Sequence, residues 1–286
     1  MANNKKDTLL ITLEGPPSVT EDGDLLQGDI FHLSGQGQGK EGVELARGFS
    51  GLLRPALEYR YDTSAEQQGS TFVGVVATRR RLEAAVNVFG DTPKEFRANW
   101  RRWMRNNRPQ VESKLWFESS DSAKRYAFVR VSAEAATEAL DTDPSLLRLV
   151  RDMPWTWESD YAYFFGEKER VEYDSSGTAV FRNDSDVDEV YPKIFLPGPG
   201  SYTVGDITTP TLTADEVVRI NFNPEHSTYV KRNIKTGVVT NLWYLLNGKR
   251  PRWQLQPDSI NTHKITFTNA ESVPYLEYTP LYEGVF

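Results

Sequence analysis

The residues most suggestive of chemistry form a glycine-rich segment at positions 37–42, which reads GQGKEG. This spacing of glycines is typical of loops that bind the phosphates of a dinucleotide through backbone N–H groups. Such a loop needs a strand before it and a long helix after it, whereas Gly48, Gly51 and Pro55 interrupt the segment that follows here. We therefore interpret residues 34–42 as a flexible loop rather than as a nucleotide site.

Histidine, cysteine and carboxylate chemistry finds no supporting motif. The three histidines, His32, His226 and His263, have no second histidine at a ligand spacing, so each is interpreted as a surface or hydrogen-bonded structural residue. The absence of cysteine excludes disulfides and thiolate chemistry. Carboxylates are abundant, but no local pattern marks a catalytic pair. The sequence therefore predicts neither an enzyme nor a cofactor.

An acidic run from Asp184 to Asp188 is the one candidate for a calcium site. Its start resembles an EF-hand loop, but Glu189 and Phe195 stand where that loop has glycine and glutamate. An irregular Ca²⁺ site and a solvated acidic loop both remain open for this run.

One amphipathic helix is predicted to begin at Pro93. Thr92 and Glu95 form a capping box around this proline, which occupies the first helical position. An apolar stripe follows at helical spacing and consists of Phe96, Trp100, Trp103 and Met104. We expect the helix to end before Pro109.

The opposite face of this helix carries a stripe of four arginines, Arg97, Arg101, Arg105 and Arg108. Residues 79–108 contain nine Lys or Arg and three Asp or Glu, in a chain whose net charge is -7. The arginine stripe is either a solvated face or a surface for an acidic partner. Because the rest of the chain is acidic, copies could associate head to tail and close into a ring. These four residues are our candidates for an oligomer interface.

Composition narrows the class of protein. The chain has 286 residues, of which 38% are hydrophobic and 12% aromatic, enough for one large or two ordinary domains. Its negative charge argues against a general nucleic-acid binder. No apolar run approaches the roughly 18 residues of a membrane span, and the N-terminus lacks a signal-peptide core. We expect a soluble protein that is made in a reducing setting.

Two domains are predicted, residues 1–166 and 167–286. Within the first, we interpret residues 14–50 as an arm or insertion. In the second, short β runs alternate with turns, which predicts a β-sandwich of jelly-roll type. These runs are residues 178–181, 193–196, 217–222, 238–246 and 263–268. Trp243 and Trp253 could stack on sugar rings there, although tryptophans are more often core or interface residues.

The order of elements in the first half resembles a known family. The sequence reads RRLEAAVNVFG at 80–90, continues through the capped helix, and then reads LWF at 115–117 and RYAFVR at 125–130. This order of strand, capped helix and strand pair resembles the ring-forming domain of siphophage distal tail proteins. The stretch MPWTWE at 153–158 is similar to the proline–aromatic stretch that follows this domain in the family.

The second half resembles the galectin-like sandwich of the same family. Its opening matches EVYPKIFLPGPG at 189–200, and its later strands match VKRN at 230–233, NLW at 241–243 and WQLQP at 253–257. The turn PDSIN at 257–261 lacks the glycine that the family has there. The likeness covers roughly residues 70–286 and is strongest to minor tail proteins of phages that infect actinobacteria.

The resemblance implies an architectural role at the distal end of a phage tail. It implies a mainly β protein whose first domain forms a homohexameric ring, with galectin-like sandwiches outside. The ring would join the tail tube protein to the tail-tip hub or tail-associated protein, and the genome would pass through without sequence-specific contact. Assembly would take place in the host cytoplasm. Whether the outer sandwich binds host glycan or other tail proteins remains open. A carbohydrate-binding module and a hydrolase with dispersed carboxylates are the competing hypotheses.

Overall fold

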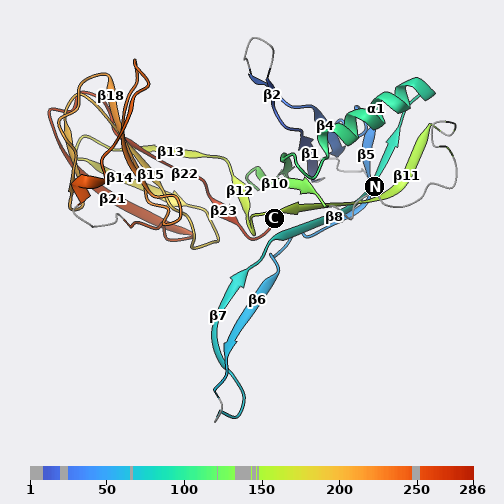
Figure 1. Cartoon of the computed structure of the whole chain (residues 1–286), viewed down its shortest axis with the longest axis horizontal. Coiled ribbons are helices and arrows are strands. Elements are labelled where there is room, and N and C mark those ends of the chain that lie inside the picture. The colour runs from blue at the N-terminus through green and yellow to red at the C-terminus, as the bar shows by residue number, and fades with distance from the viewer. Residues whose placement is uncertain are drawn as a thin grey trace. The chain divides into compact units, whose positions relative to one another are not determined.

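The computed structural model of the chain describes residues 9–19, 25–64, 67–120, 122–132, 143, 146, 148–246 and 252–286. By their internal contacts the residues divide into two compact units (Figure 1). Unit 1 contains Met1–Phe165 together with Glu283–Phe286, and unit 2 contains Gly166–Tyr282. The linear division at residues 166 and 167 does not include this return of the last four residues to unit 1.

Unit 1 is built on an antiparallel sheet with the strand order β4-β1-β9-β10-β11-β8-β5. Alternating burial along β8, β9 and β10 places every second side chain in the core, as a strand with one covered face requires. The strands are β1 (Leu10–Glu14), β4 (Ile30–Ser34), β5 (Val43–Ser50), β8 (Arg80–Phe89), β9 (Ser113–Glu118), β10 (Arg125–Val131), β11 (Leu149–Ser159) and β12 (Phe164–Gly166), which pairs with β10. A short hairpin pairs β2 (Ser18–Val19) with β3 (Leu25–Leu26).

The segment 14–50, interpreted from the sequence as an arm or insertion, supplies two strands of this sheet. β4 pairs with β1, and β5 pairs with β8. The glycine-rich loop between β4 and β5 is a series of hydrogen-bonded turns rather than the flexible loop expected. The N–H groups of Gln38, Lys40 and Gly42 each donate to a glycine carbonyl three residues earlier. Glycines with positive φ allow these successive turns.

The predicted helix is confirmed as α1 (Pro93–Asn106). The N–H of Glu95 donates to Thr92 Oγ1 at 3.2 Å, and the Glu95 carboxylate accepts from the N–H of Asp91 at 3.1 Å. The helix ends three residues before Pro109. Its capping residues therefore perform the role that their types predict.

Aromatic side chains join α1 to the sheet. Trp103 is fully buried, and its ring centroid lies 5.3 Å from those of Phe31 and Trp155 and 6.2 Å from that of Trp157. The indole N–H of Trp157 donates to Asn107 Oδ1 at 2.9 Å, so the polar tip of this buried ring has a partner. The apolar stripe of α1 thus forms the centre of the unit 1 core.

A second hairpin projects from this sheet as an arm. It consists of β6 (Leu57–Asp62) and β7 (Thr71–Ala77), which pair with each other and with no other described strand. Figure 1 shows the arm leaving unit 1 at the start of β8. All of β6 and most of β7 are exposed.

Unit 2 is a sandwich of two antiparallel sheets, with orders β13-β22-β15-β18-β19-β20 and β14-β21-β16-β17. Its core contains Ile194, Leu196, Val218, Ile220 and Leu276, all completely buried. The strands are β13 (Glu169–Glu172), β14 (Thr178–Asn183), β15 (Lys193–Pro197), β16 (Ser201–Val204), β17 (Ile207–Thr208), β18 (Glu216–Asn221), β19 (Thr228–Asn233), β20 (Val239–Asn241), β21 (Ser259–Thr268), β22 (Tyr275–Tyr278) and β23 (Leu281–Tyr282).

The predicted fold class is confirmed: the described residues are mainly β, with one α-helix and two sandwich regions. One predicted strand needs correction. Residues 238–246 divide into β20 and the 3₁₀ helix η1 (Trp243–Leu246). The Asn241 side chain accepts from the N–H of Trp243 at 2.9 Å, and this local turn ends the strand.

Candidate functional site

The arginine stripe lies on the exposed face of α1 and just beyond its end. Arg97, Arg101, Arg105 and Arg108 are all exposed. Arg105 forms an ion pair with Asp29, at 3.0 Å between Nη2 and Oδ2. Within the described part of the chain, the other three arginines have no carboxylate partner. The structure therefore brings the four predicted residues onto one surface and leaves three of their charges uncompensated.

Asp29 ties the last turn of α1 to the segment before β4. It accepts hydrogen bonds from Asn106 at 2.7 Å, Arg102 at 2.9 Å and Arg105 at 3.0 Å. Burial opposes ionisation of Asp29, but these three donors hold its pKa below the ordinary value. The contacts fix the orientation of the helix, and with it the direction in which the stripe faces.

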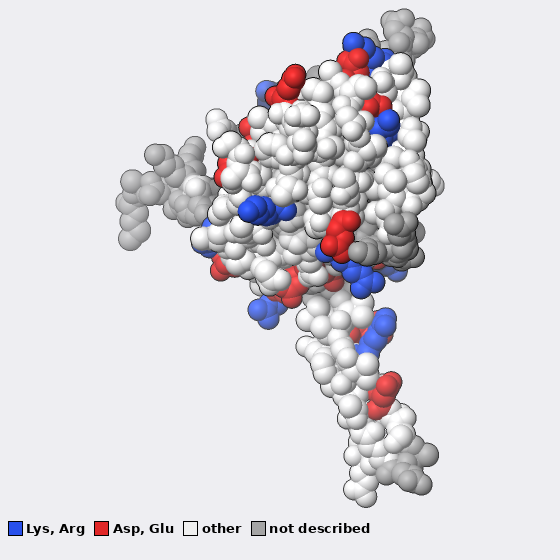
Figure 2. Space-filling model, turned by 90° about the vertical axis from the view of Figure 1, so that its left-hand side faces the viewer, with Lys and Arg blue, Asp and Glu red and all other residues white. Residues whose placement is uncertain are grey.

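One face of the β6–β7 arm is apolar and has no partner. Its exposed apolar side chains are Leu57, Tyr59, Tyr61, Phe72 and Val75, each between 43% and 57% exposed. The opposite face carries Glu58, Arg60 and Asp62. In Figure 2 the arm extends below the body, and most of its visible surface is uncharged. A lone two-stranded hairpin is marginal in water, and an uncovered apolar surface of this kind marks an interaction site.

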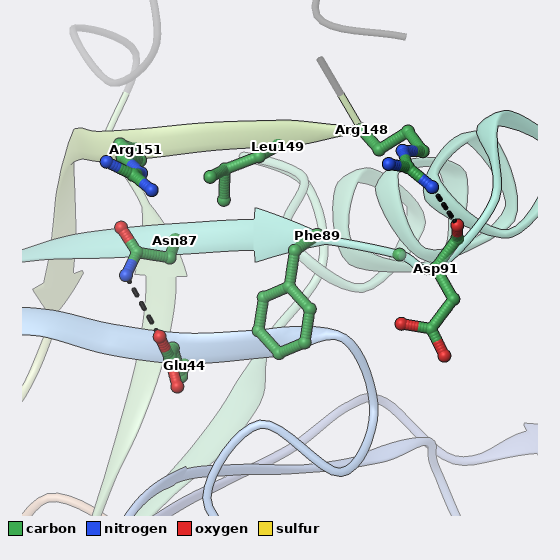
Figure 3. Close-up of a pocket in the computed structure, with 8 residues that line it drawn as sticks. Glu44, Asn87, Phe89, Asp91, Arg148, Leu149 and Arg151 are labelled. Carbon is green, nitrogen blue, oxygen red and sulfur yellow. Dashed lines mark hydrogen bonds between the residues drawn. The ribbon is translucent and has the colours of Figure 1, made fainter. Parts of the chain in front are cut away.

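An open cleft of about 590 Å³ lies where β5, β8 and β11 meet (Figure 3). Its lining residues are Glu44, Asn87, Phe89, Gly90, Asp91, Arg148, Leu149 and Arg151. Asn87 donates to Glu44 at 3.0 Å, and Arg148 donates to the carbonyl of Asp91 at 2.6 Å. Arg148 has a positive φ of 56°, beside the bulge of β11. Sequence reasoning did not find this cleft, because a bulge leaves no residue pattern.

The two tryptophans proposed for glycan contact lie in unit 2, and both are half-buried against its core. Trp253 stacks on His263 with ring centroids 3.9 Å apart, and Phe222 meets its edge at 5.6 Å. Trp243 begins η1, and its neighbour Tyr244 is 69% exposed. The structure places the two tryptophans in different environments, with Tyr244 as the more accessible aromatic beside Trp243.

His263 is held neutral inside unit 2. Burial lowers its pKa to about 4, while its Nδ1 lies 2.8 Å from the Tyr173 hydroxyl. Burial also raises the pKa of Tyr173. Both groups are therefore uncharged at neutral pH, and their contact is an ordinary hydrogen bond in the sandwich core.

The stability of unit 2 is expected to rise by up to about 3 kcal/mol between pH 4 and pH 6.5. In this window the unfolded chain protonates His263, whereas the folded chain does not, so lowering the pH favours unfolding. Urea unfolding of the whole chain, followed by tryptophan fluorescence at several pH values, measures this change. His263→Gln should flatten the dependence in that window, and an unchanged slope in the variant would contradict the assignment to His263.

Neither metal binding nor membrane crossing finds a structural basis in the described residues. No group of three or more His, Asp or Glu side chains gathers there in a way that could hold a metal ion. In the acidic run, Asp184 instead accepts from Arg182 at 2.7 Å, which corrects the irregular calcium site considered for Asp184–Asp188. Among the described helices, none has the length and apolar character that a membrane crossing requires.

Known structures resemble the chain over nearly its whole length, although no protein-family model and no curated protein sequence matches it. The crystal structure of the Dit protein (gp 19.1) of phage SPP1 has a TM-score of 0.59 and 14% identity, covering 95% of this chain and 98% of that chain. It is described as a paradigm of the hub adsorption apparatus in phages infecting Gram-positive bacteria. A chain of the phage P2 baseplate in its activated conformation with Ca has a TM-score of 0.50 and 11% identity, covering 97% and 99%.

Both alignments extend over units 1 and 2, so the likeness is not confined to one common sandwich. It agrees with the resemblance found in the sequence. The chain therefore has the fold of a phage distal tail protein.

Proposed function

We propose that this chain is a structural component of a phage tail tip, and that six copies form a ring joining the tail tube to the tail-tip hub. The observation that carries the proposal is the alignment with SPP1 Dit over 95% of this chain. A fold alone does not define a function, so the proposal also needs surfaces suited to assembly. Unit 1 supplies two of them, the apolar arm and the arginine stripe.

The proposed role is mechanical and not enzymatic. Unit 1 would form the ring, unit 2 would lie outside it, and the genome would pass through the lumen without sequence-specific contact. The partners would be further copies of the chain, the tail tube protein and the hub or tail-associated protein. The sequence resemblance to tail proteins of actinobacterial phages makes an actinobacterium the host that we propose.

Co-expression with the tail tube and hub proteins of the same phage tests this role. We expect the tagged chain to retain both proteins through affinity capture and gel filtration. An unrelated sandwich protein carrying the same tag is the control. If neither partner is retained above that control, the proposed position between tube and hub is wrong.

The arginine stripe gives a prediction of its own for assembly. Arg97→Glu, Arg101→Glu and Arg108→Glu together should reduce the fraction of assembled chains, because three uncompensated charges would then repel an acidic partner surface. Raising the salt to about 1 M should weaken the unmodified assembly, since the Debye length falls to about 3 Å. Light scattering at low and high salt measures both effects.

A matched control for the stripe exists in unit 2. Arg219, Arg232 and Arg252 are exposed and, within the described residues, have no carboxylate partner. Their replacement by glutamate changes the net charge by the same amount. If both triple variants assemble equally well, the stripe is a solvated helix face.

A glycan-binding role for unit 2 is the second candidate, and the exposed Tyr244 beside Trp243 favours it. Sugar rings stack on exposed aromatic faces, and such binding would change tryptophan fluorescence. Titration with host cell-wall glycans should quench the emission of the whole chain but not that of Tyr244→Ala. The absence of a response to any of these glycans would remove this candidate.

A further inference from the structure

A cluster of aromatic side chains lies on the face of β9 and β10 that points away from the unit 1 core. Its members are Trp116, Tyr126, Phe128, Tyr161 and Phe165. The ring centroid of Tyr126 lies 4.6 Å from that of Trp116, 5.3 Å from Phe128 and 5.4 Å from Phe165. Tyr161 extends the cluster and is 50% exposed. We call this surface the β9–β10 aromatic face.

Lysine side chains add positive charge to the β9–β10 aromatic face. Lys114 Nζ lies 5.4 Å from the Tyr126 ring centroid and 5.6 Å from that of Trp116. Lys124 Nζ lies 4.5 Å from the Trp116 ring centroid. Cations over aromatic rings are attracted to them, so these lysines stay close to the apolar surface. The surface is therefore apolar at its centre and positively charged around it.

The apolar face of the arm matches this surface in chemistry and charge. It offers tyrosine, phenylalanine and valine side chains, which pair well with aromatic rings. Residues 57–77 contain three acidic residues and one basic residue, whereas residues 113–131 contain four basic and two acidic residues. A strand of six residues is about 20 Å long, enough to cross several aromatic rings.

The two surfaces do not meet within one chain. β6 and β7 pair only with each other among the described strands, and Figure 1 shows the arm pointing away from the sheet. A second copy of the chain can bring them together. One copy would then supply the arm and the next copy the aromatic face, which is the unequal type of contact that closes into a ring.

We infer that the apolar face of the β6–β7 arm of one copy packs on the β9–β10 aromatic face of the next copy. This inference rests on the self-assembly in the proposed function and names the surfaces that meet. It makes the arm the donor and the aromatic face the acceptor at every contact of the ring.

Chemical cross-linking between two singly substituted chains tests the contact. The chain has no cysteine, so Val75→Cys chains and Lys114→Cys chains each carry one reactive group. A short bis-maleimide added to their mixture should give a covalent heterodimer. The control mixture replaces Lys114→Cys with Arg97→Cys, an exposed position on α1, which packs on the other face of the sheet. We expect the heterodimer to be lost in the control.

The native mass of the same mixtures separates failure of the contact from failure of assembly. Assembled chains without the Val75–Lys114 product, or with equal product in the Arg97 control, would overturn the contact and leave self-assembly standing. Protomers without the product would overturn the contact and count against self-assembly of the chain alone. A glycan that prevents the product without changing the native mass would reassign the aromatic face to sugar binding.

Discussion

Replacing Arg80 with methionine is expected to lower the free energy of unfolding of unit 1 by about 3–5 kcal/mol. Arg80 is only 2% exposed. Its guanidinium donates to the carbonyls of Gly51 at 2.6 Å, Ala162 at 2.9 Å and Glu283 at 2.6 Å. Methionine would fill much of the volume but leave these acceptors without a donor, at about 1–3 kcal/mol for each buried group.

The charge state of Arg80 does not change this expectation. Burial lowers its pKa to about 10, so the guanidinium stays protonated at neutral pH. Arg81→Met is the matched control, because the side chain of Arg81 is 51% exposed and pairs with Glu83 at the surface. We expect that variant to lose under about 1 kcal/mol. Urea unfolding followed by tryptophan fluorescence compares the two, and equal losses would contradict the structural role of Arg80.

Removing the arm is expected to abolish the assembly of purified chains while leaving unit 1 folded. The N–H of Thr78 donates to the carbonyl of Ala56 at 2.8 Å, so the two ends of the arm are already a hydrogen-bonded pair. An Asn-Gly turn can therefore replace residues 57–77 without moving the sheet. Light scattering should give the mass of one protomer, with a circular dichroism spectrum that keeps its β character.

Point variants show which face of the arm acts. Tyr59→Ser with Phe72→Ser removes apolar area from the exposed apolar face and should also leave protomers. Glu58→Ser with Val76→Ser changes the opposite face and should assemble normally. If the arm deletion leaves the assembled mass unchanged, the arm has no part in association. If both pairs weaken assembly equally, the apolar face is not the contact.

The local elements were predictable because short-range physics determines them. Thr92, Pro93 and Glu95 determine where α1 begins, and the spacing of its aromatic residues identifies its buried face. Strands with one covered face, such as β8 and β18, follow their alternation. The same alternation places Arg80 on the inward face with Leu82 and Ala84, a signal that the sequence analysis did not use.

The arm and the aromatic face could not be recognised from sequence alone. In β6, the alternation of Leu57, Tyr59 and Tyr61 has the pattern of a strand that covers its own core. Exposure depends on whether another part of the chain covers that face, which is a matter of tertiary structure. The three carbonyl partners of Arg80 lie 29, 82 and 203 residues away, a separation that no local pattern encodes.

The return of residues 283–286 to unit 1 was missed for the same reason. Arg125 donates to the carbonyls of Gly284 at 2.7 Å and Phe286 at 3.0 Å, and Arg80 donates to that of Glu283. Two arginines from β8 and β10 thus hold this segment. The chain passes between the units twice, after Phe165 and after Tyr282. Unit 2 is therefore a two-ended insertion, which a linear division of the sequence does not show.

The native mass of the full chain, measured by light scattering alone and with the tail tube protein, tests the central claim most directly. The account predicts a discrete species of six protomers of 32.5 kDa each, formed alone or on addition of the tube protein. A single protomer in both samples, at low and moderate salt, would contradict the proposal that this chain forms the ring of a phage tail tip.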